Sequence, residues 1–493
     1  MQKDRKNVVS HAAAYLLARG VPGIIAFLAI PLFSRLLDPE GYGKCAIAAA
    51  TAAMVSALTF QWVRLSFVRY LPAAKGNPRP LKSTVLTCQL LVVGIEGIVT
   101  LAIYLLPTPA SWRSIAGICW MIIAAQSLFE LCCEQARAMI QPRYYMGLQL
   151  TRVGLSTGLG AVFIVSGMGW WGPLMGIIVG NLLPALYAWW RDWRSTTLGI
   201  DREMLHRICV YGIPLSLTVG LSFVISSSDR YIIAYYLGEG AAGVYSVAVD
   251  FTSQTLTLLL MTISLAIVPL AMRSWENDDH EGARLQMRHN SILLLAVGIP
   301  AVAGMILLAP SIAHSFLGKS FRVDAARIIP IIAFGTFLAG YKAYYLDTAF
   351  QFAHRTIYQV WIVLIAAIVN VALNLLVMRY TALGIIGAAG ASVIAYVISM
   401  ALTAYYGRRH FALPFPVRDF LQVLVASGTM ALALCLIRDY RGTIALATQI
   451  ATGTTVYAAI LFAFNFQDVR TVIVQRLAKR GAAASAVHVA AAQ

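Results

Sequence analysis

Charged side chains within long apolar stretches are the residues of this chain with the clearest potential for chemistry. Four basic residues lie within such stretches: Arg19, Arg152, Arg230 and Lys342. A charge at the centre of a bilayer costs roughly 2.5–3.5 kcal/mol on insertion scales, so each is a functional-site hypothesis. Together they would cost on the order of 10 kcal/mol if lipid surrounded them. We therefore expect each to face water, a ligand or an opposite charge.

Two of the basic residues are candidates for a cavity that recognises anions. An arginine stays charged and binds phosphate or carboxylate through two parallel hydrogen bonds. Arg19 precedes Gly20, Pro22 and Gly23, which permit a bend, and it is the deepest candidate for cavity contact. A structural ion pair is the alternative for this residue. Arg64 lies at the end of the second apolar stretch and is a candidate for the cavity mouth.

The other three basic residues have simple structural alternatives. Arg152 lies one or two turns inside its stretch and can extend toward the nearest membrane surface. Arg230 adjoins Asp229, and anchoring of its helix explains it as well as ligand contact does. Lys342 precedes Asp347, and a lysine–aspartate pair explains it as well as phosphate contact does.

Acidic residues within the stretches bear on coupling to ions. Asp250, Glu96 and Glu130 all lie inside apolar segments. A buried carboxylate can bind a proton or a sodium ion, or it can neutralise an arginine. The excess of basic over acidic groups favours the ion pair. Asn370 and Asn374 share one helix face, where hydrogen bonding between helices is the default role.

The composition indicates an integral membrane protein. Hydrophobic residues make up 59% of the 493 residues and charged residues 12%, whereas a soluble protein carries roughly 25% charged residues. About 20 consecutive apolar residues cross a bilayer as a helix. Fourteen such stretches are predicted, near 8–34, 45–63, 83–106, 114–135, 145–167, 172–190, 209–236, 243–271, 291–315, 325–350, 356–378, 382–406, 418–437 and 442–466.

The distribution of basic residues predicts the orientation. With the N-terminus inside, the inside segments hold 25 Lys and Arg residues and the opposite side about 9. This asymmetry follows the positive-inside rule, so we expect a multi-pass protein with both termini in the cytoplasm. The asymmetry also accounts for much of the +17 net charge. We therefore expect no nucleic-acid partner.

Two Gly-rich turns indicate an internal repeat. Leu36–Ala46 reads LLDPEGYGKCA and Tyr236–Ser246 reads YLGEGAAGVYS, which aligns Gly43 with Gly243. Six apolar stretches separate the turns, so both copies have the same orientation. Parallel repeats of this kind are found in transporters. We expect the two turns to lie on the outer side, where the two copies approach each other.

The repeat predicts the organisation of the chain. We expect an all-α integral membrane fold of about 14 transmembrane helices, with two parallel six-helix bundles around a central cavity. The predicted segments are an N-terminal bundle, a C-terminal bundle, two additional helices and a disordered cytoplasmic tail, at 1–205, 206–410, 411–480 and 481–493.

The sequence contains no motif typical of enzymes or cofactor sites. There is no GxxxxGK[ST] phosphate-binding loop and no HExxH zinc motif. The seven cysteines form no CxxC pair, and no histidine accompanies them at ligand spacing. We expect no enzymatic activity, no metal and no cofactor.

Four segments resemble bacterial polysaccharide flippases of the multidrug/oligosaccharidyl-lipid/polysaccharide exporter superfamily. They are RLLDPEGYG at Arg35–Gly43, RAMIQPRYY at Arg137–Tyr145, the stretch Asp229–Asp250, and the stretch Asn370–Tyr396. The resemblance covers nearly the whole chain in helix count, order and loop lengths. These segments are turns and packing surfaces, so they identify the fold better than the substrate.

The resemblance implies a transport function. Family members move polyprenyl-pyrophosphate-linked oligosaccharides from the inner to the outer leaflet of the bacterial cytoplasmic (inner) membrane. Their central cavity is commonly cationic and opens alternately to each side. Exopolysaccharide, capsule or O-antigen synthesis would use the product, with a polysaccharide polymerase and glycosyltransferases as possible partners.

Three alternative functions remain. A lipid-linked peptidoglycan-precursor flippase would share the cationic cavity. A drug/cation antiporter of the same superfamily would favour acidic groups, against which the surplus of buried cations argues. A membrane polysaccharide polymerase would need a long outward loop, whereas the longest here, about 316–325, is short.

Overall fold

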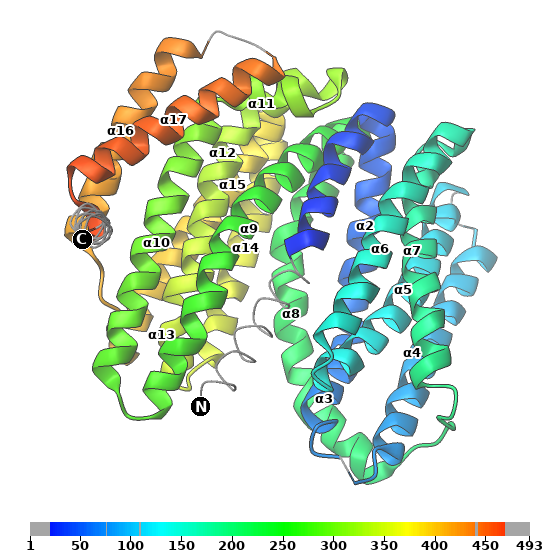
Figure 1. Ribbon diagram of the computed structural model, residues 1–493. Coiled ribbons are helices and arrows are strands. Elements are labelled where there is room, and N and C mark those ends of the chain that lie inside the picture. The colour runs from blue at the N-terminus through cyan, green and yellow to red at the C-terminus, as the bar shows by residue number, and fades with distance from the viewer. Residues whose placement is uncertain (1–19, 75, 108–109, 439–441, 469–493) are drawn as a thin grey trace, which may run out of the picture.

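The predicted all-α membrane fold is confirmed. The computed structural model describes residues 20–74, 76–107, 110–438 and 442–468, and within them every regular element is a helix (Figure 1). Helices satisfy their own backbone groups, which lipid cannot do. Twelve of these helices are long and apolar enough to cross a membrane. The shorter apolar helix Gly20–Leu36 and the long helix α8, Arg202–Leu237, run beside them.

The first six predicted stretches form one group of helices, which we call the first bundle. It comprises the helix Gly20–Leu36, α2 (Pro39–Thr59), α3 (Gln61–Tyr70), α4 (Arg79–Leu105), α5 (Ala110–Ala138), α6 (Pro142–Phe163) with the π-helix η1 (Ile164–Met168), and α7 (Trp171–Asp192). The second predicted stretch is therefore two helices, α2 and α3, which meet at Phe60.

The next six stretches form the second bundle. It comprises α8 (Arg202–Leu237), α9 (Glu239–Glu276), α10 (His280–Leu307) with α11 (Ala309–Phe316), the 3-10 helix η2 (Lys319–Phe321), α12 (Arg322–Tyr341) with the π-helix η3 (Lys342–Leu346) and α13 (Thr348–Phe352), α14 (Ile357–Tyr380), and α15 (Gly384–His410).

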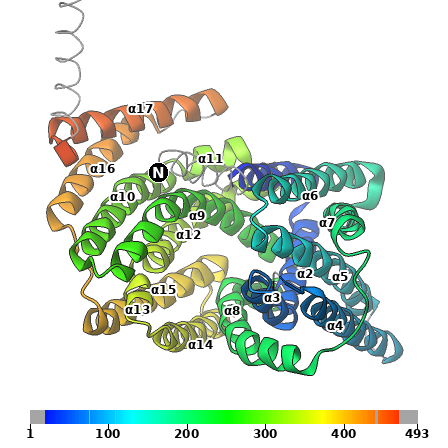
Figure 2. The ribbon, with the colours of Figure 1, turned by 60° about the horizontal axis from the view of Figure 1, so that its bottom comes forward.

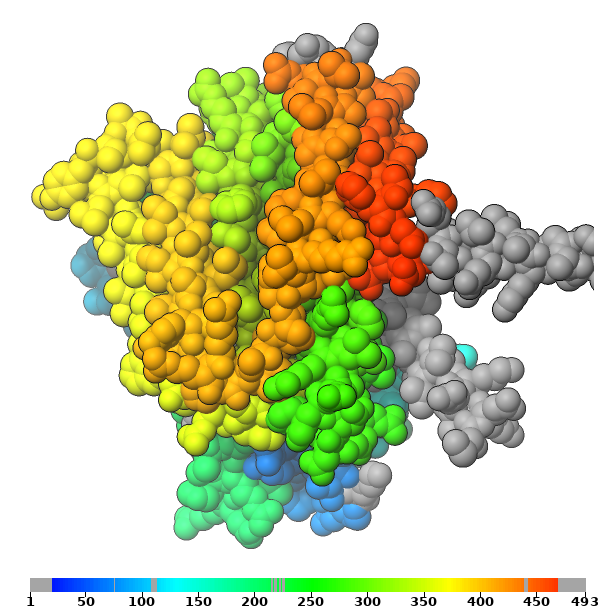
Figure 3. Space-filling model, turned by 90° about the vertical axis from the view of Figure 1, so that its left-hand side faces the viewer, coloured from blue at the N-terminus to red at the C-terminus, as the bar shows by residue number. Residues whose placement is uncertain are grey.

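The last two spans dock on the outside of the second bundle. These are α16 (Val417–Ile437) and α17 (Thr443–Ala463), with the short 3-10 helix η4 (Phe466–Asp468) after them. Figure 2 and Figure 3 show α16 and α17 beside α10. Tyr457 of α17 donates its hydroxyl to the Ala296 carbonyl of α10 over 2.7 Å. The carboxylate of Asp419 accepts from Gln467 at 2.5 Å and from Arg288 at 3.5 Å.

Local sequence signals explain where helices begin. Asp38 precedes Pro39 and caps α2, because its side chain accepts the Gly41 N–H at 3.1 Å. Asp201 caps α8 in the same way through the Met204 N–H at 3.0 Å. Between α8 and α9 the chain turns at Gly238, whose φ of 87° suits glycine.

Small residues let α6 and α7 approach closely, as the glycine spacing of α7 predicts. A Cβ at Gly176 would overlap the backbone of Gly160, and one at Gly180 would overlap the Ser156 side chain. Small-xxx-small faces of this kind are a common way for helices to pack in lipid.

The two bundles meet at the ends of α2 and α9, which we call the closed end. A Cβ at Gly43 would overlap the Glu239 carbonyl, and one at Gly243 would overlap the Pro39 carbonyl. The two repeated turns are therefore in backbone contact, which confirms that they lie where the bundles approach. From there the ribbons of the bundles diverge toward the opposite end (Figure 1). The distribution of basic residues predicts that the closed end is the outer one.

Helix α8 links the bundles, because its two halves pack on different partners. Near its start, the Ile208 carbonyl accepts from Ser66 of α3 at 3.0 Å. Near its end, Ser228 donates to the side-chain oxygen of Asn370 in α14 over 3.1 Å. Figure 1 places it between the two groups. Arg19 and the predicted disordered tail 481–493 lie outside the described residues.

Candidate functional site

A polar cavity of about 420 Å³ lies between the bundles. Five helices supply its walls: α2 from the first bundle and α8, α9, α12 and α15 from the second. On α8, seven positions separate the cavity-lining Arg230 from the helix end at Leu237, which is roughly 10 Å along the helix axis. Its lining residues are Ala49, Ala50, Ala53, Phe223, Ser227, Asp229, Arg230, Tyr245, Val249, Asp250, Ser253, Ile332, Gly335, Thr336, Ala389, Ser392, Val393 and Tyr396.

Asp229 is the centre of a hydrogen-bond network on one wall of this cavity. Its carboxylate accepts from the Tyr245 hydroxyl at 2.7 Å, the Asn374 amide at 2.8 Å and the Ser392 hydroxyl at 2.5 Å. Asn370 donates to Ser392 at 3.1 Å. These partners come from α9, α14 and α15, so Asp229 joins four helices. The two asparagines bond between helices, as their shared face predicts.

Arg230 and Asp250 form an ion pair on the adjacent wall. Arg230 points away from its neighbour Asp229, and its Nη2 donates to the carboxylate of Asp250 on α9. The Arg230 side chain is 13% exposed and that of Asp250 is 32% exposed. The aspartate therefore reaches the cavity space more freely than the arginine does.

Among the described residues, the charged side chains that line this cavity are Arg230, Asp229 and Asp250. If all three are ionised, the lining carries one net negative charge. The sequence placed the basic residues in apolar stretches but could not show which of them share a cavity.

Arg64 is paired within the first bundle and does not line this cavity. Its guanidinium forms an ion pair with Glu130 of α5 and donates to Gln61 at 2.6 Å. Gln126 donates to the other carboxylate oxygen of Glu130 at 2.8 Å. Arg64 lies six residues from the end of α3, on the side of the molecule opposite the closed end.

Arg152 contacts a glutamine and an aromatic ring. Its Nε donates to Gln149 at 3.2 Å, one turn earlier on α6. The guanidinium carbon lies 5.4 Å from the ring centroid of Phe129, within the range of a cation–π contact. Arg152 does not line the central cavity either.

Lys342 is paired with Asp347 across the π-helix η3. Its Nζ donates to both carboxylate oxygens at 2.9 Å. The same two residues are also joined through the backbone, because the Asp347 N–H donates to the Lys342 carbonyl at 2.9 Å. The structure therefore has the lysine–aspartate pair that the sequence offered as the alternative to phosphate contact.

Glu96 differs from the other intramembrane carboxylates. Its two oxygens are buried beside Thr59 without a well-formed hydrogen bond. Among the described residues it has no cationic partner. Ion pairs hold the other three carboxylates of this set, those of Asp250, Glu130 and Asp347. We assign no partner to Glu96.

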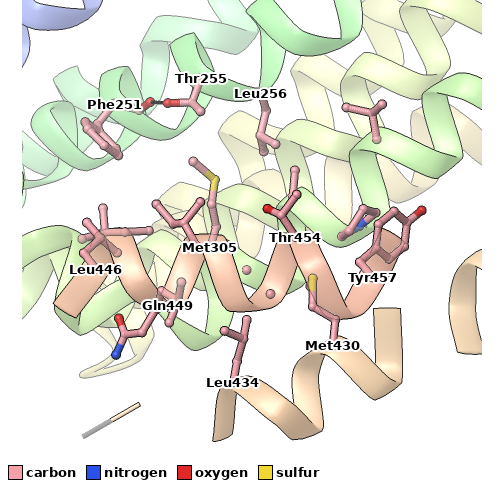
Figure 4. Close-up of a pocket in the computed structure, with 18 of the residues that line it drawn as sticks. Phe251, Thr255, Leu256, Met305, Met430, Leu434, Leu446, Gln449, Thr454 and Tyr457 are labelled. Atoms are coloured by element: carbon pink, nitrogen blue, oxygen red, sulfur yellow. Dashed lines mark hydrogen bonds between the residues drawn. The ribbon is translucent and has the colours of Figure 1, made fainter. Parts of the chain in front are cut away.

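An apolar groove of about 520 Å³ lies on the other face of α9 (Figure 4). The helix Gly20–Leu36, α9, α10 and α11 form one side, and α16 and α17 form the other. Its lining includes Phe251, Leu256, Met305, Leu446 and Tyr457, which point into the space between these helices.

Helix α9 is the wall between the cavity and the groove. Asp250 and Ser253 face the cavity, whereas Phe251, Thr255 and Leu256 face the groove. No motif in the sequence predicts a function for α16 and α17, so the groove was not predicted. A usable signal was present in α17, where Gly453 lets Leu434 of α16 pack closely beside the groove.

Comparison with known proteins agrees on family and fold. A family model described as "Polysaccharide biosynthesis protein" matches residues 32–326. No curated protein matches the chain. Among solved structures, a lipid II flippase, MurJ, in an inward closed conformation has a TM-score of 0.78 at 16% identity, over 93% of this chain and 99% of that chain.

Two transporters that are described as members of the MOP superfamily have lower TM-scores. An inward-facing multidrug resistance MATE transporter has a TM-score of 0.57 at 14% identity, over 80% of this chain and 97% of that chain. A transporter from Pyrococcus furiosus, described as having a binding pocket of reverse polarity, has a TM-score of 0.55 at 15% identity, over 82% and 94%.

Proposed function

Because the chain belongs to the polysaccharide biosynthesis protein family and has a flippase fold, we propose that it translocates polyprenyl-pyrophosphate-linked oligosaccharide repeat units. The transfer runs from the inner to the outer leaflet of the bacterial cytoplasmic membrane. The product then serves exopolysaccharide, capsule or O-antigen synthesis, with a polymerase and glycosyltransferases acting on the same lipid-linked intermediates.

The observation that carries this proposal is the pair of compartments on the two faces of α9. A lipid-linked oligosaccharide has a polar, hydroxyl-rich head and a long apolar tail. The cavity offers carboxylate, hydroxyl and guanidinium groups for the head, and the groove offers an apolar surface for the tail. A substrate that is polar throughout would have no use for the groove.

Alternating access is the transport mechanism that suits this arrangement. In the closed state, backbone contact at Gly43 and Gly243 prevents passage at the outer end. The bundles would separate there to release the head group, and close there to accept the next one. Arg230 is the proposed phosphate contact within the cavity, with the diphosphate taking the place of Asp250.

Ion coupling is proposed for the carboxylates of the second bundle. Asp229 connects α8 with α9, α14 and α15, so a proton or sodium ion bound there would act on four helices at once. Asp250 would bind the coupling ion and Arg230 alternately. Glu96 is the corresponding candidate in the first bundle.

The test is flipping by the purified protein in proteoliposomes. A fluorescent polyprenyl-diphosphate-linked oligosaccharide is placed in both leaflets, and a membrane-impermeant reductant destroys the outer-leaflet signal. We expect protein-containing vesicles to lose the whole signal and protein-free vesicles to lose about half. Loss of only half with this lipid, but of all signal with a lipid-linked peptidoglycan precursor, would establish the alternative substrate.

A further inference from the structure

Three basic residues lie beside one end of the groove, near the closed end of the bundles. Phe316 of α11 lines the groove there. The carbonyl groups on either side of it each accept a hydrogen bond from an arginine. Arg35 Nη2 donates to the Ser315 carbonyl at 2.6 Å, and Arg322 Nε donates to the Leu317 carbonyl at 3.2 Å. Both guanidinium groups therefore lie next to the groove wall.

Lys319 adds a third positive charge to the same place. The preceding residue, Gly318, is in close contact with the helix Gly20–Leu36, because its N–H donates to the Ser34 hydroxyl at 3.2 Å. A Cβ at Gly318 would lie 3.3 Å from the Cα of Arg35. Lys319 is exposed and follows directly. We call Arg35, Lys319 and Arg322 the basic rim.

The basic rim is not neutralised by carboxylates of the described chain. None of its three residues forms an ion pair there. Asp324 is close in sequence, but it pairs with Arg327 at 3.5 Å. Asp38 is occupied as the cap of α2. In the central cavity, by contrast, the one described arginine is paired with the carboxylate of Asp250.

The apolar part of the site continues directly from the rim. Phe316 packs against Phe251 in a tilted arrangement with 5.3 Å between ring centroids, and its ring centroid lies 6.2 Å from that of Phe27. The groove then extends along α17 from Leu446 to Tyr457, eleven residues or roughly 16 Å along the helix axis. A ligand that fills both parts must carry its negative charge at one end of an apolar chain.

We propose that the basic rim binds the diphosphate of a prenyl-linked lipid at the outer leaflet, with the prenyl chain in the groove. Two arginines and a lysine supply several charge-assisted donors, which match a diphosphate better than the single charge of an ordinary phospholipid. The site would hold the lipid after its head has crossed. The identification of this lipid as cargo rests on the proposed function.

The experiment measures binding of farnesyl diphosphate to the full chain in nanodiscs of zwitterionic lipid. The variant Lys319→Gln/Arg322→Gln should bind it more weakly by roughly tenfold or more, since hydrogen bonds to charged groups are lost. Arg327→Gln is the matched control at the same end, and it should change affinity by no more than about twofold. Arg35 is left intact because it also ties two helices together.

Three results would overturn the proposal. Wild-type affinity in the double variant would exclude the basic rim. Equal weakening by Arg327→Gln would indicate unspecific surface charge. Displacement of farnesyl diphosphate by phosphatidylglycerol would indicate a general phospholipid site. The single variant Lys319→Gln controls for misfolding, because it removes no described hydrogen bond. It should weaken binding of farnesyl diphosphate by up to roughly fivefold.

This binding measurement is separate from the flipping assay. If the rim variants lose affinity but the wild type flips no lipid-linked oligosaccharide, the rim stands and the proposed cargo does not. If the wild type flips its cargo and the rim variants bind as tightly as the wild type, the rim proposal fails and the proposed function stands.

Discussion

The two faces of α9 differ in where charged side chains lie and in how they are paired. On the cavity face, Arg230 and Asp250 neutralise each other and Asp229 accepts three hydrogen bonds. On the groove face, the described lining holds no charged residue, and the basic rim lies beside Phe316 at the closed end. One helix thus separates a compartment suited to a polar head from one suited to an apolar tail.

The difference has a consequence for how each compartment responds to change. Charges held in a buried pair depend on each other, so removing one leaves the other without a partner. Apolar contacts in a groove are many and weak, and each contributes little alone. Substitutions in the cavity should therefore have larger effects than substitutions in the groove.

Breaking the cavity pair should have the largest effect. Arg230→Gln leaves Asp250 unpaired and should lower the free energy of unfolding by roughly 3–5 kcal/mol and abolish flipping. The neutral double variant Arg230→Gln/Asp250→Asn should regain most of the stability, measured by thermal unfolding, without regaining flipping. Flipping at the wild-type rate by the double variant would remove Arg230 from the cargo site.

Widening the closed end should have the next largest effect. In Gly43→Ala the new methyl group meets the Glu239 carbonyl, and overpacking of this kind costs roughly 1–3 kcal/mol. With Cys45 as the sole cysteine, its labelling by an impermeant thiol reagent should accelerate roughly tenfold. Gly147→Ala, where a Cβ has open space, should leave the labelling rate unchanged. Equal acceleration by both variants would contradict the closed-end contact.

Filling the groove should reduce flipping more moderately. Gly304 lines the groove and a Cβ there meets no atom within 4 Å, so the side chain in Gly304→Leu should occupy part of the groove. Excluding about two methylene groups of the tail, at ~0.8 kcal/mol each, should slow flipping roughly tenfold. Gly428→Leu on the exposed face of α16 is the matched control. If both variants flip at the wild-type rate, the groove does not hold the tail.

The smallest effect is expected at the pair outside the cavity. Lys342→Met/Asp347→Leu replaces a buried ion pair by apolar groups, which is often neutral or stabilising. Flipping should stay within about twofold of the wild-type rate, and the melting temperature should not fall. Loss of flipping in a folded double variant would instead place Lys342 on the transport path.

The sequence predicted the fold better than the sites. Apolar length alone defines the spans, and each of the fourteen predicted stretches coincides with helix where the structure describes it. The repeat placed Gly43 and Gly243 correctly at the contact between the bundles. Helices in lipid must be long and apolar wherever they lie, so these signals survive in any membrane protein.

The sites depend on information that periodicity does not contain. Arg64, Arg230 and Lys342 look alike in the sequence, yet each is paired with a different carboxylate and Arg230 alone of them lines the cavity. The groove arises because α17 crosses beside α10, and two apolar helices give no sign of which faces will meet. The basic rim combines residues about 280 positions apart in the chain.

The most direct measurement is flipping with the closed end locked. A Cβ at Gly240 would lie 4.0 Å from the Glu40 backbone nitrogen, so we choose these two positions for a cysteine pair across the bundles. In proteoliposomes, oxidation of the variant Glu40→Cys/Gly240→Cys in a cysteine-free background should stop flipping of the lipid-linked oligosaccharide, and a reductant should restore it. Unchanged flipping with the disulfide intact would contradict transport by separation of the bundles.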